Sequence, residues 1–150
     1  MSLLARILPP GNVLCGLDVG SKAQLFEEAG WLFENNLQLP RKKVIGSLAT
    51  REKLGSTGLG YGIAIPHGRI KGLREATGAF FRLKTPISFD APDGQPVGML
   101  FILLVPEQAT DLHLQILGEL AQMFSNRQLR EKLQASSDPV ETYRLLTTWS

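Results

Sequence analysis

Apolar residues recur at helical spacing in several stretches of the chain. Between residues 21 and 36 one apolar stripe predicts a helix, and it is formed by Leu25, Phe26, Ala29, Leu32 and Phe33. Ser21, followed three residues later by Gln24, is a capping-box start for this helix. Pro40 opens a second predicted helix, which has apolar residues at positions 44, 45 and 48 and ends at Gly55.

The second half of the chain has the clearest helical pattern. After Asp111 a long helix is predicted from the spacing of Leu112, Ile116, Leu117, Leu120, Ala121 and Phe124. Two shorter helices are predicted over residues 127–134 and 138–147. In the last of these, Asp138 is the expected cap and Pro139 lies in the first turn.

Three apolar runs between these helices predict strands. The first covers residues 61–65, the second covers 76–83 and ends at Thr85-Pro86, and the third covers 99–105. The third run is apolar throughout and is stopped by Pro106, which is typical of a central strand covered on both faces. Because helices precede and follow the strands, we expect an α/β layered domain with a central sheet. The pattern does not give the order of the strands.

Composition narrows the class of protein. A length of 150 residues suits a single domain, predicted over residues 1–150, and an apolar fraction of 43% is ordinary for a soluble protein. The net charge of +2, from 16 basic and 14 acidic residues, gives no reason to expect nucleic-acid binding. One cysteine, Cys15, excludes an internal disulfide and suits a reducing compartment. No apolar run approaches the roughly 20 residues of a membrane helix, so we expect a cytoplasmic protein without direct membrane insertion.

Residues 55–68 hold the most informative motif, Gly-Ser-Thr-Gly-Leu-Gly-Tyr-Gly-Ile-Ala-Ile-Pro-His-Gly. Gly58, Gly60 and Gly62 are expected to form a phosphate-binding loop, because glycines expose backbone N–H groups and leave room for a bulky anion. The apolar run that follows predicts that His67 lies at the end of a strand, beside this loop. A histidine next to an anion-binding backbone suggests phosphoryl chemistry on the histidine itself.

The sequence does not match the motifs of nucleotide, dinucleotide or zinc sites. The glycine loop lacks the Gly-Lys-Ser/Thr ending of a nucleotide P-loop, and its spacing is not the Gly-x-Gly-x-x-Gly of a dinucleotide site. Two histidines and one cysteine without close spacing do not predict a zinc site. We therefore expect neither a cofactor nor a metal.

Two further residues are candidates on weaker grounds. His113 lies in the first turn of the helix predicted after Asp111, where free N–H groups favour a nearby anion. His113 also borders the apolar stripe of that helix, and spacing alone does not separate the two interpretations. Arg51 lies near the end of the second helix, and a guanidinium can grip phosphate oxygens with two N–H groups. From spacing alone, an ordinary exposed arginine among neighbouring basic residues is the simpler interpretation.

Taken together, these residues resemble the enzyme IIA domain of the bacterial phosphoenolpyruvate-dependent phosphotransferase system. The similarity is to the fructose/mannitol class and, within it, to the nitrogen-regulatory branch. The matching segments are Thr50-Arg-Glu-Lys-Leu-Gly-Ser-Thr with the glycine loop to Gly68, Pro86-Ile-Ser-Phe-Asp-Ala-Pro-Asp-Gly-Gln-Pro-Val97, Leu103-Leu-Val-Pro106, and Asp111-Leu-His113-Leu-Gln-Ile-Leu117. The resemblance covers essentially the whole chain.

The resemblance implies a mixed β-sheet with helices on both faces and a site built around His67. In the family the histidine at the position of His67 carries the phosphoryl group, and the residues at the positions of Arg51 and His113 line the same pocket. The implied donor is a small histidine phosphocarrier protein of the sugar or nitrogen branch. The implied regulated partners are cytoplasmic proteins such as potassium-transport components or sensor kinases. Leu59, Tyr61 and Ile70 lie near His67 in the sequence and are candidates for the rim that docks the donor, with core packing as the alternative and the expected role of Ile70.

Three functions follow from these expectations. The first is a phosphohistidine carrier whose phosphorylation state regulates other proteins. The second is a sugar-specific enzyme IIA that passes phosphate to a cysteine of a separate enzyme IIB. The third is a module that holds phosphate or a phosphoprotein without covalent transfer.

Overall fold

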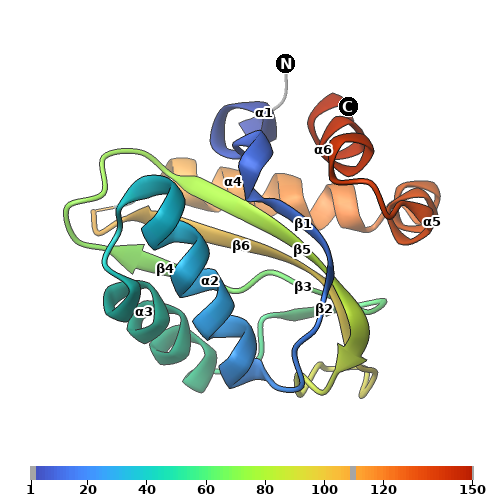
Figure 1. Ribbon diagram of the computed structural model, residues 1–150, viewed down its shortest axis with the longest axis horizontal. Coiled ribbons are helices and arrows are strands. Elements are labelled where there is room, and N and C mark those ends of the chain that lie inside the picture. Colours follow the sequence, from blue (N-terminus) through green and yellow to red (C-terminus); the bar gives the residue numbers. More distant parts are fainter. Residues whose placement is uncertain (1–2, 109–110, 150) are drawn as a thin grey trace.

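The computed structural model describes residues 3–108 and 111–149, and within them one mixed six-stranded sheet carries helices on both faces (Figure 1). The strands are β1 (Val13–Leu17), β2 (Gly58–Gly60), β3 (Ile63–Ala64), β4 (His67–Ile70), β5 (Thr77–Ile87) and β6 (Val97–Pro106). The helices are α1 (Leu3–Ile7), the 3₁₀ turn η1 (Pro10–Asn12), α2 (Lys22–Leu37), α3 (Arg41–Lys53), α4 (Asp111–Phe124), α5 (Arg127–Ala135) and α6 (Pro139–Thr148). The expected fold class is confirmed.

Strand β6 is the centre of the sheet. Along the path β1-β5-β6-β3-β2, β5 runs antiparallel to β6, and β1 runs parallel to β5. On its other side β6 pairs in parallel with both β3 and β4. The expected central strand at residues 99–105 is therefore confirmed, and it extends to Val97 at its start and to Pro106 at its end.

Alternate residues of β6 belong to two different hydrophobic cores. Leu100, Ile102 and Leu104 pack in the core beneath α2 and α3. The other core, beneath α1, α4, α5 and α6, contains Met99, Phe101, Leu103 and Val105. All seven side chains are buried, which explains why the run is apolar throughout rather than alternating.

The segment around Pro66 differs from the expected strand that ends there. A turn at residues 61–62 separates β2 from β3, and β4 begins at His67 itself. Ile63 pairs with Met99 and His67 with Leu103, so β3 and β4 keep one register along β6. Pro66 has no N–H, but its carbonyl oxygen accepts from the Leu103 N–H at 2.9 Å. The ladder therefore resumes after the proline, and His67 starts an edge strand instead of ending one.

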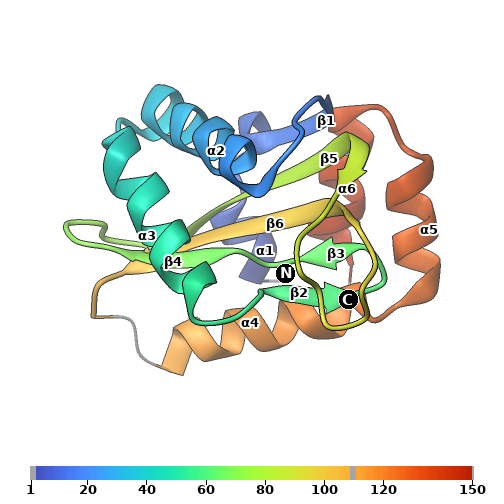
Figure 2. The same cartoon turned by 90° about the horizontal axis from the view of Figure 1, so that it is seen from below.

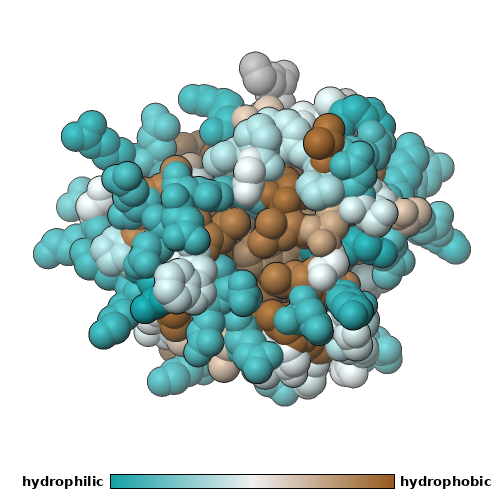
Figure 3. Space-filling model, in the orientation of Figure 1, coloured by the Kyte–Doolittle hydropathy of each residue, from teal (hydrophilic) through white to brown (hydrophobic). Residues whose placement is uncertain are grey.

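Two other boundaries differ from the sequence-based expectation. Strand β5 continues past Thr85-Pro86 to Ile87, because its register with β6 shifts after Arg82 and the proline falls in the irregular stretch. Strand β1 was not expected, since its five residues include Gly16 and show no alternating pattern. Figure 3 shows apolar side chains gathered over the β1 side of the molecule, where β1 forms the sheet edge.

The expected helix starts are confirmed by their caps. The Ser21 hydroxyl accepts from the Gln24 N–H at 3.2 Å, and the Gln24 side chain accepts from the Gly20 N–H at 2.7 Å. At the start of α6 the Asp138 carboxylate accepts from the Val140 N–H at 3.0 Å. Side-chain caps thus fix where both helices begin.

Helix α3 packs closely against the edge strand β4, and Gly68 makes this approach possible. A Cβ at Gly68 would lie 2.0 Å from the Ser47 Oγ and 3.1 Å from the Ser47 backbone carbon. The Ser47 hydroxyl in turn donates to the Arg69 carbonyl at 2.9 Å. Helix α3 is thereby held beside the residues that follow His67 (Figure 2).

This packing predicts that Gly68→Ala lowers the free energy of unfolding by about 1–3 kcal/mol, because the new methyl group overlaps Ser47. The matched control is Gly118→Ala in the exposed part of α4, where a Cβ meets nothing within 4 Å. That change should raise stability by up to about 1 kcal/mol, since alanine favours a helix over glycine. Urea denaturation measures both. Equal effects of the two substitutions would contradict the close α3–β4 packing.

Candidate functional site

His67 is the first residue of β4, which pairs with β6. Helices α3 and α4 belong to the cores on opposite faces of the sheet, and both lie near β4 (Figure 2). Residues 63, 65, 67 and 69 share one face of the β3–β4 segment, and Ile63 and Ile65 belong to the core beneath α4. The His67 ring therefore points to the side of the sheet from which α4 approaches. Gly68 and Ile70 face the opposite side, toward α3.

One hydrogen bond fixes the orientation and tautomer of the His67 ring. Its Nδ1 lies 2.9 Å from the carbonyl oxygen of Ile65. A carbonyl can only accept, so Nδ1 carries the ring proton in the neutral imidazole. The Nε2 atom is then left with its lone pair, which is the state of a nitrogen nucleophile.

The pKa of His67 is lowered from its ordinary value. Burial is the main cause, because it disfavours the charged imidazolium, and the nearby Arg51 guanidinium acts in the same direction. The hydrogen bond to Ile65 and the carboxylate of Glu52 oppose this shift. The ring is therefore neutral, and its Nε2 unprotonated, at neutral pH.

The structure brings His113 to His67, as the resemblance implied. The two ring centroids are 5.7 Å apart with an angle of 74° between the planes. Burial lowers the pKa of His113, and His67 and Arg69 lower it further. The Nε2 of His113 is buried and has no hydrogen-bond partner among the described residues. An unpartnered ring nitrogen at this position is suited to a ligand that reaches the same cavity.

Arg51 lies on the α3 side of the same cavity. One guanidinium nitrogen donates to the Gly55 carbonyl at 2.9 Å, which holds the side chain against its own loop. The guanidinium has five N–H donors, so others stay available to an anion. The structure thus places Arg51, His67 and His113 around one space.

This space is an open cavity of about 710 Å³. Its lining is Lys42, Lys43, Gly46, Ser47, Thr50, Arg51, Leu54, His67, Gly68, Arg69, Ile70, Lys71, Glu107 and His113. Five of these side chains are basic and one is acidic. The sequence does not reveal that Lys42, Lys43, Arg69 and Lys71 form a group, because they are separated along the chain and only the packing of α3 against β4 brings them together.

Glu52 fixes the loop that follows Arg51. Its carboxylate, only 6% exposed, accepts from the Lys22 ammonium at 3.1 Å and from both the N–H (3.1 Å) and the hydroxyl (2.7 Å) of Thr57. The Ile65 N–H donates to the Thr57 carbonyl at 3.0 Å, but the Thr57 N–H is directed to Glu52 instead of back to Ile65. The Ile65 carbonyl is consequently left to the His67 ring.

The three glycines expected to bind phosphate do not line this cavity. Gly58 pairs with Ala64 in the β2–β3 hairpin, and a Cβ there would lie 2.9 Å from the Ala91 Cβ. Gly60 and Gly62 have positive φ angles of 94° and 77°, which the turn between β2 and β3 requires. The β2–β3 hairpin therefore accounts for a glycine at each of these three positions.

Backbone donors come instead from the edge strand β4. In its parallel ladder with β6, the Pro66 carbonyl accepts from Leu103, so Pro66 and Gly68 direct their backbone groups toward β6. The alternation directs the N–H groups of His67 and Arg69 to the open edge, beside the cavity. These two donors replace the glycine loop as candidates for contact with an anion.

The three candidates for the docking rim have different positions, and Ile70 has the core-packing role expected for it. Ile70 lines the cavity, but it is buried and contributes packing. Leu59 and Tyr61 are exposed and are not part of the lining. The Tyr61 ring lies beneath the Arg130 guanidinium, 4.0 Å from its centroid.

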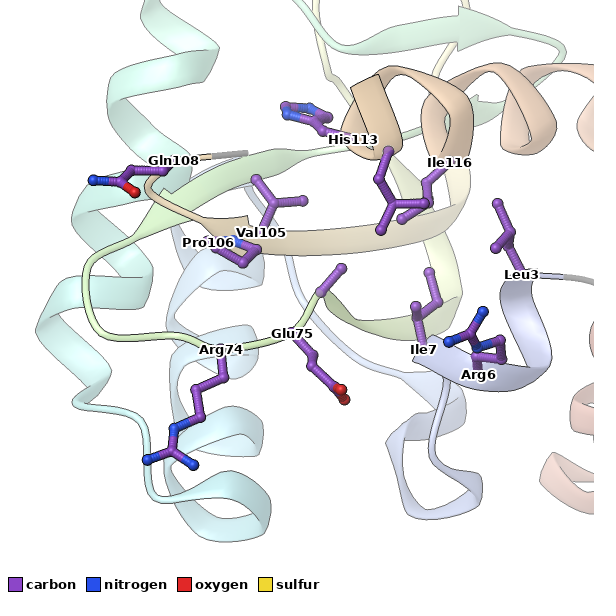
Figure 4. A pocket seen from close by; sticks show the side chains of 12 residues that line it. Leu3, Arg6, Ile7, Arg74, Glu75, Val105, Pro106, Gln108, His113 and Ile116 are labelled. Carbon is purple, nitrogen blue, oxygen red and sulfur yellow. The ribbon is translucent and has the colours of Figure 1, made fainter. Parts of the chain in front are cut away.

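A second, smaller cavity of about 380 Å³ lies on the other side of the first turn of α4 (Figure 4). Its apolar lining includes Leu3, Ile7, Val105, Leu112 and Ile116, and His113 lines both cavities. Figure 4 shows the His113 ring directed away from Ile116. The ring therefore belongs with His67 rather than with this apolar space.

The described residues provide few other sites for chemistry. Within residues 3–108 and 111–149, no group of three or more His, Cys, Asp or Glu side chains is placed to hold a metal ion. In the same part of the chain, no helix combines the length and apolar character needed to span a bilayer. Cys15 contacts the buried Thr142 hydroxyl at 3.5 Å, outside the cavity around His67.

Comparison with known proteins identifies the family. Residues 6–149 match the family described as "Phosphoenolpyruvate-dependent sugar phosphotransferase system, EIIA 2". A protein of Pseudomonas aeruginosa named "Nitrogen regulatory protein" is 40% identical over 147 residues, which cover 97% of this chain and 96% of the relative.

Solved structures agree with this assignment. The crystal structure of nitrogen regulatory protein IIA-Ntr from Neisseria meningitidis is 52% identical and superposes with a TM-score of 0.91, covering 97% of this chain and 99% of that one. The Escherichia coli IIA mannitol structure shares the fold at 20% identity, with a TM-score of 0.78, 92% of this chain and 97% of that one. The predicted resemblance is confirmed, and the chain belongs to the EIIA 2 family of the phosphoenolpyruvate-dependent phosphotransferase system.

Proposed function

We propose that this chain accepts a phosphoryl group on Nε2 of His67 from a histidine phosphocarrier protein and regulates other proteins through its phosphorylation state. One observation carries the first half of the proposal. The unprotonated Nε2 belongs to a ring whose Nδ1 is held by the Ile65 carbonyl, beside a cavity lined by five basic side chains. That combination supports attack on an anionic phosphoryl donor.

The proposed step exchanges one nitrogen–phosphorus bond for another. The Nε2 lone pair of His67 forms a bond to phosphorus, while the bond between phosphorus and the donor imidazole breaks. The donor ring reacts with its second nitrogen protonated, so the electron pair of the broken bond leaves it as a neutral imidazole. The His67 ring keeps its Nδ1 proton on the Ile65 carbonyl and takes up the positive charge that the donor ring loses. No oxidant, metal or nucleotide enters this balance.

Charge on the transferring group is spread over three equatorial oxygens. Arg51 is suited to grip two of them, and the backbone N–H groups of His67 and Arg69 are directed to the same edge. His113, through its unpartnered Nε2, is suited to donate to or orient the group. These are preorganised donors, which need no rearrangement when charge develops.

The regulatory half of the proposal rests on the relatives named for nitrogen regulation. A phosphoryl group adds roughly two negative charges at His67, by analogy with other protein phosphates, and so changes which partner docks there. Potassium-transport components and sensor kinases are candidate partners. The second candidate is a sugar-specific enzyme IIA with a cysteine acceptor, which the words "sugar phosphotransferase system" in the family description favour.

The first prediction for this function is that His67→Ala takes up no phosphate from the phosphorylated carrier protein. Wild type should gain one acid-labile, alkali-stable phosphoryl group, and phosphorus–proton NMR couplings should place it on Nε2 of the ring. The control is His113→Ala, which should still become labelled, although more slowly. Full labelling of His67→Ala, or phosphorus on Nδ1, would show that the nucleophile is misassigned.

Arg51 and His113 should matter to the rate of transfer more than to folding. Loss of one preorganised donor typically costs about 10²–10³ in rate, so Arg51→Ala and His113→Ala should each fall in this range. Arg51→Lys keeps the charge but loses the planar fork, and its rate should lie between wild type and Arg51→Ala. Single-turnover transfer measures the rates and thermal unfolding monitors the fold. Unchanged rates in all three variants would refute the cavity as the site of transfer.

Regulation predicts partners that distinguish the two phosphorylation states. Lysate proteins can be captured on wild type, on phosphorylated wild type and on His67→Ala as a permanently unphosphorylated form. We expect binders that prefer one state by about 5- to 150-fold and do not themselves accept phosphate. Rapid phosphate transfer to a permease cysteine, with no state-selective binder, would favour the sugar-transport function.

A further inference from the structure

The charge of the protein is concentrated around His67. Lys42, Lys43, Arg51, Arg69 and Lys71 line the cavity together with a single acid, Glu107, so its formal charge is +4. The whole chain has a net charge of only +2, and the rest of the molecule is therefore net negative, at −2. None of the five basic side chains forms an ion pair within residues 3–108 and 111–149.

Exposed leucines lie beside this uncompensated charge. Leu54, in the cavity lining at the end of α3, is 82% exposed. On α4, Leu112 and Leu114 adjoin His113 in the sequence and are 54% and 68% exposed, and Leu112 lines the smaller cavity on the other side of this turn. Large apolar side chains at such exposure are typical of contact surfaces when they gather in one place. Here Leu54 lies in the cavity of the proposed phosphoryl acceptor, and Leu112 and Leu114 lie on the helical turn that carries His113 into the same cavity.

We propose that this surface docks a carrier protein whose phosphohistidine lies among acidic side chains with an apolar centre. The surface consists of Leu54, Leu112 and Leu114 with Lys42, Lys43, Arg69 and Lys71. Its basic residues match an acidic face and repel a basic one, so charge selects among carriers before any chemistry occurs. The leucines provide the area that holds the encounter complex once it forms. This inference rests on the proposed function, because the carrier is its phosphoryl donor.

The same charges give transfer a direction. Before transfer the carrier adds its phosphoryl dianion to an acidic face and meets a cavity of formal charge +4. After transfer the carrier has lost that dianion, and the cavity falls to about +2. Both the carrier and the cavity then carry less opposite charge. The spent carrier is therefore bound less tightly than the loaded carrier was.

The experiment measures single-turnover transfer from the phosphorylated carrier that loads wild type fastest, at ionic strengths from low to high. Lys43→Glu combined with Lys71→Glu brings the formal charge of the cavity lining to zero. The matched control is Lys84→Glu, an exposed lysine at the other end of β5. At low salt the second-order rate constant of the double variant should fall roughly tenfold or more, whereas the control should stay close to wild type. The difference should shrink as salt screens the charges.

A second pair of variants tests the apolar centre. Leu54→Asn with Leu114→Asn should raise the carrier concentration needed for half-maximal rate, with little change in salt dependence. Val140→Asn is the control, because Val140 is an exposed apolar residue (76%) on α6 and outside the surface. Urea denaturation of each variant separates weaker docking from unfolding.

The outcomes distinguish the two proposals. Transfer to wild type that is insensitive to salt, or faster in the charge-reversed double variant, overturns the acidic carrier face and leaves the phosphocarrier function intact. Unchanged half-maximal concentration in the leucine variant overturns the apolar centre. Absence of any carrier able to load His67 overturns both the function and the docking surface.

Discussion

The orientation of His67 depends on which donor bonds to the backbone carbonyl of Ile65. In the β2–β3 hairpin the Ile65 N–H bonds to the Thr57 carbonyl, and the reciprocal bond would use the Thr57 N–H. The buried carboxylate of Glu52 takes that N–H, together with the Thr57 hydroxyl. The Ile65 carbonyl then accepts from Nδ1 of His67. Glu52, which does not line the cavity around His67, therefore helps to determine which ring nitrogen carries the lone pair.

The site lies at a sheet edge because two helices on opposite faces meet there. Helix α3 can come beside β4 only because Gly68 has no side chain, and it brings Arg51 with the basic residues. Helix α4 packs on the other face and brings His113 at its first turn. Pro66 interrupts the ladder without changing its register, so His67 begins a strand whose outer edge remains open. Each part of the site thus comes from a different layer of the fold.

The sequence predicted the elements better than it predicted their junctions. The helices with strong periodicity and caps, and the apolar strand at 99–105, were predictable because burial determines their residue types. The end of β5 and the start of β4 were not predictable, because a proline near each one indicated the end of a strand. The sheet accommodates Pro86 by a register shift and Pro66 by the loss of one hydrogen bond. The glycines of the 55–68 motif were recognised as important, but their backbone angles are required by a hairpin turn rather than by an anion. His67, Arg51 and His113 lie together as the family resemblance implied, whereas the remaining cations could be grouped only after α3 and β4 were placed.

Burial and nearby arginines lower the pKa of both His67 and His113. Burial lowers the pKa of both rings, and the cations add to this: Arg51 acts on His67, and Arg69 acts on His113. As pH falls, the folded protein therefore resists protonation of these rings more than the unfolded chain does, and stability declines below the ordinary histidine pKa. Near neutral pH burial is the main reason that Nε2 of His67 stays unprotonated, and the positive charges that would attract a phosphoryl dianion act in the same direction. Once a dianion sits on His67, the field is partly cancelled, and the affinity of His113 for a proton should rise because its neighbour has changed from a neutral ring to an anion. Under the proposed function, one arrangement of charge at the edge of β4 would contribute to the attraction of the donor, to the nucleophilicity of His67 and to the change of surface after transfer.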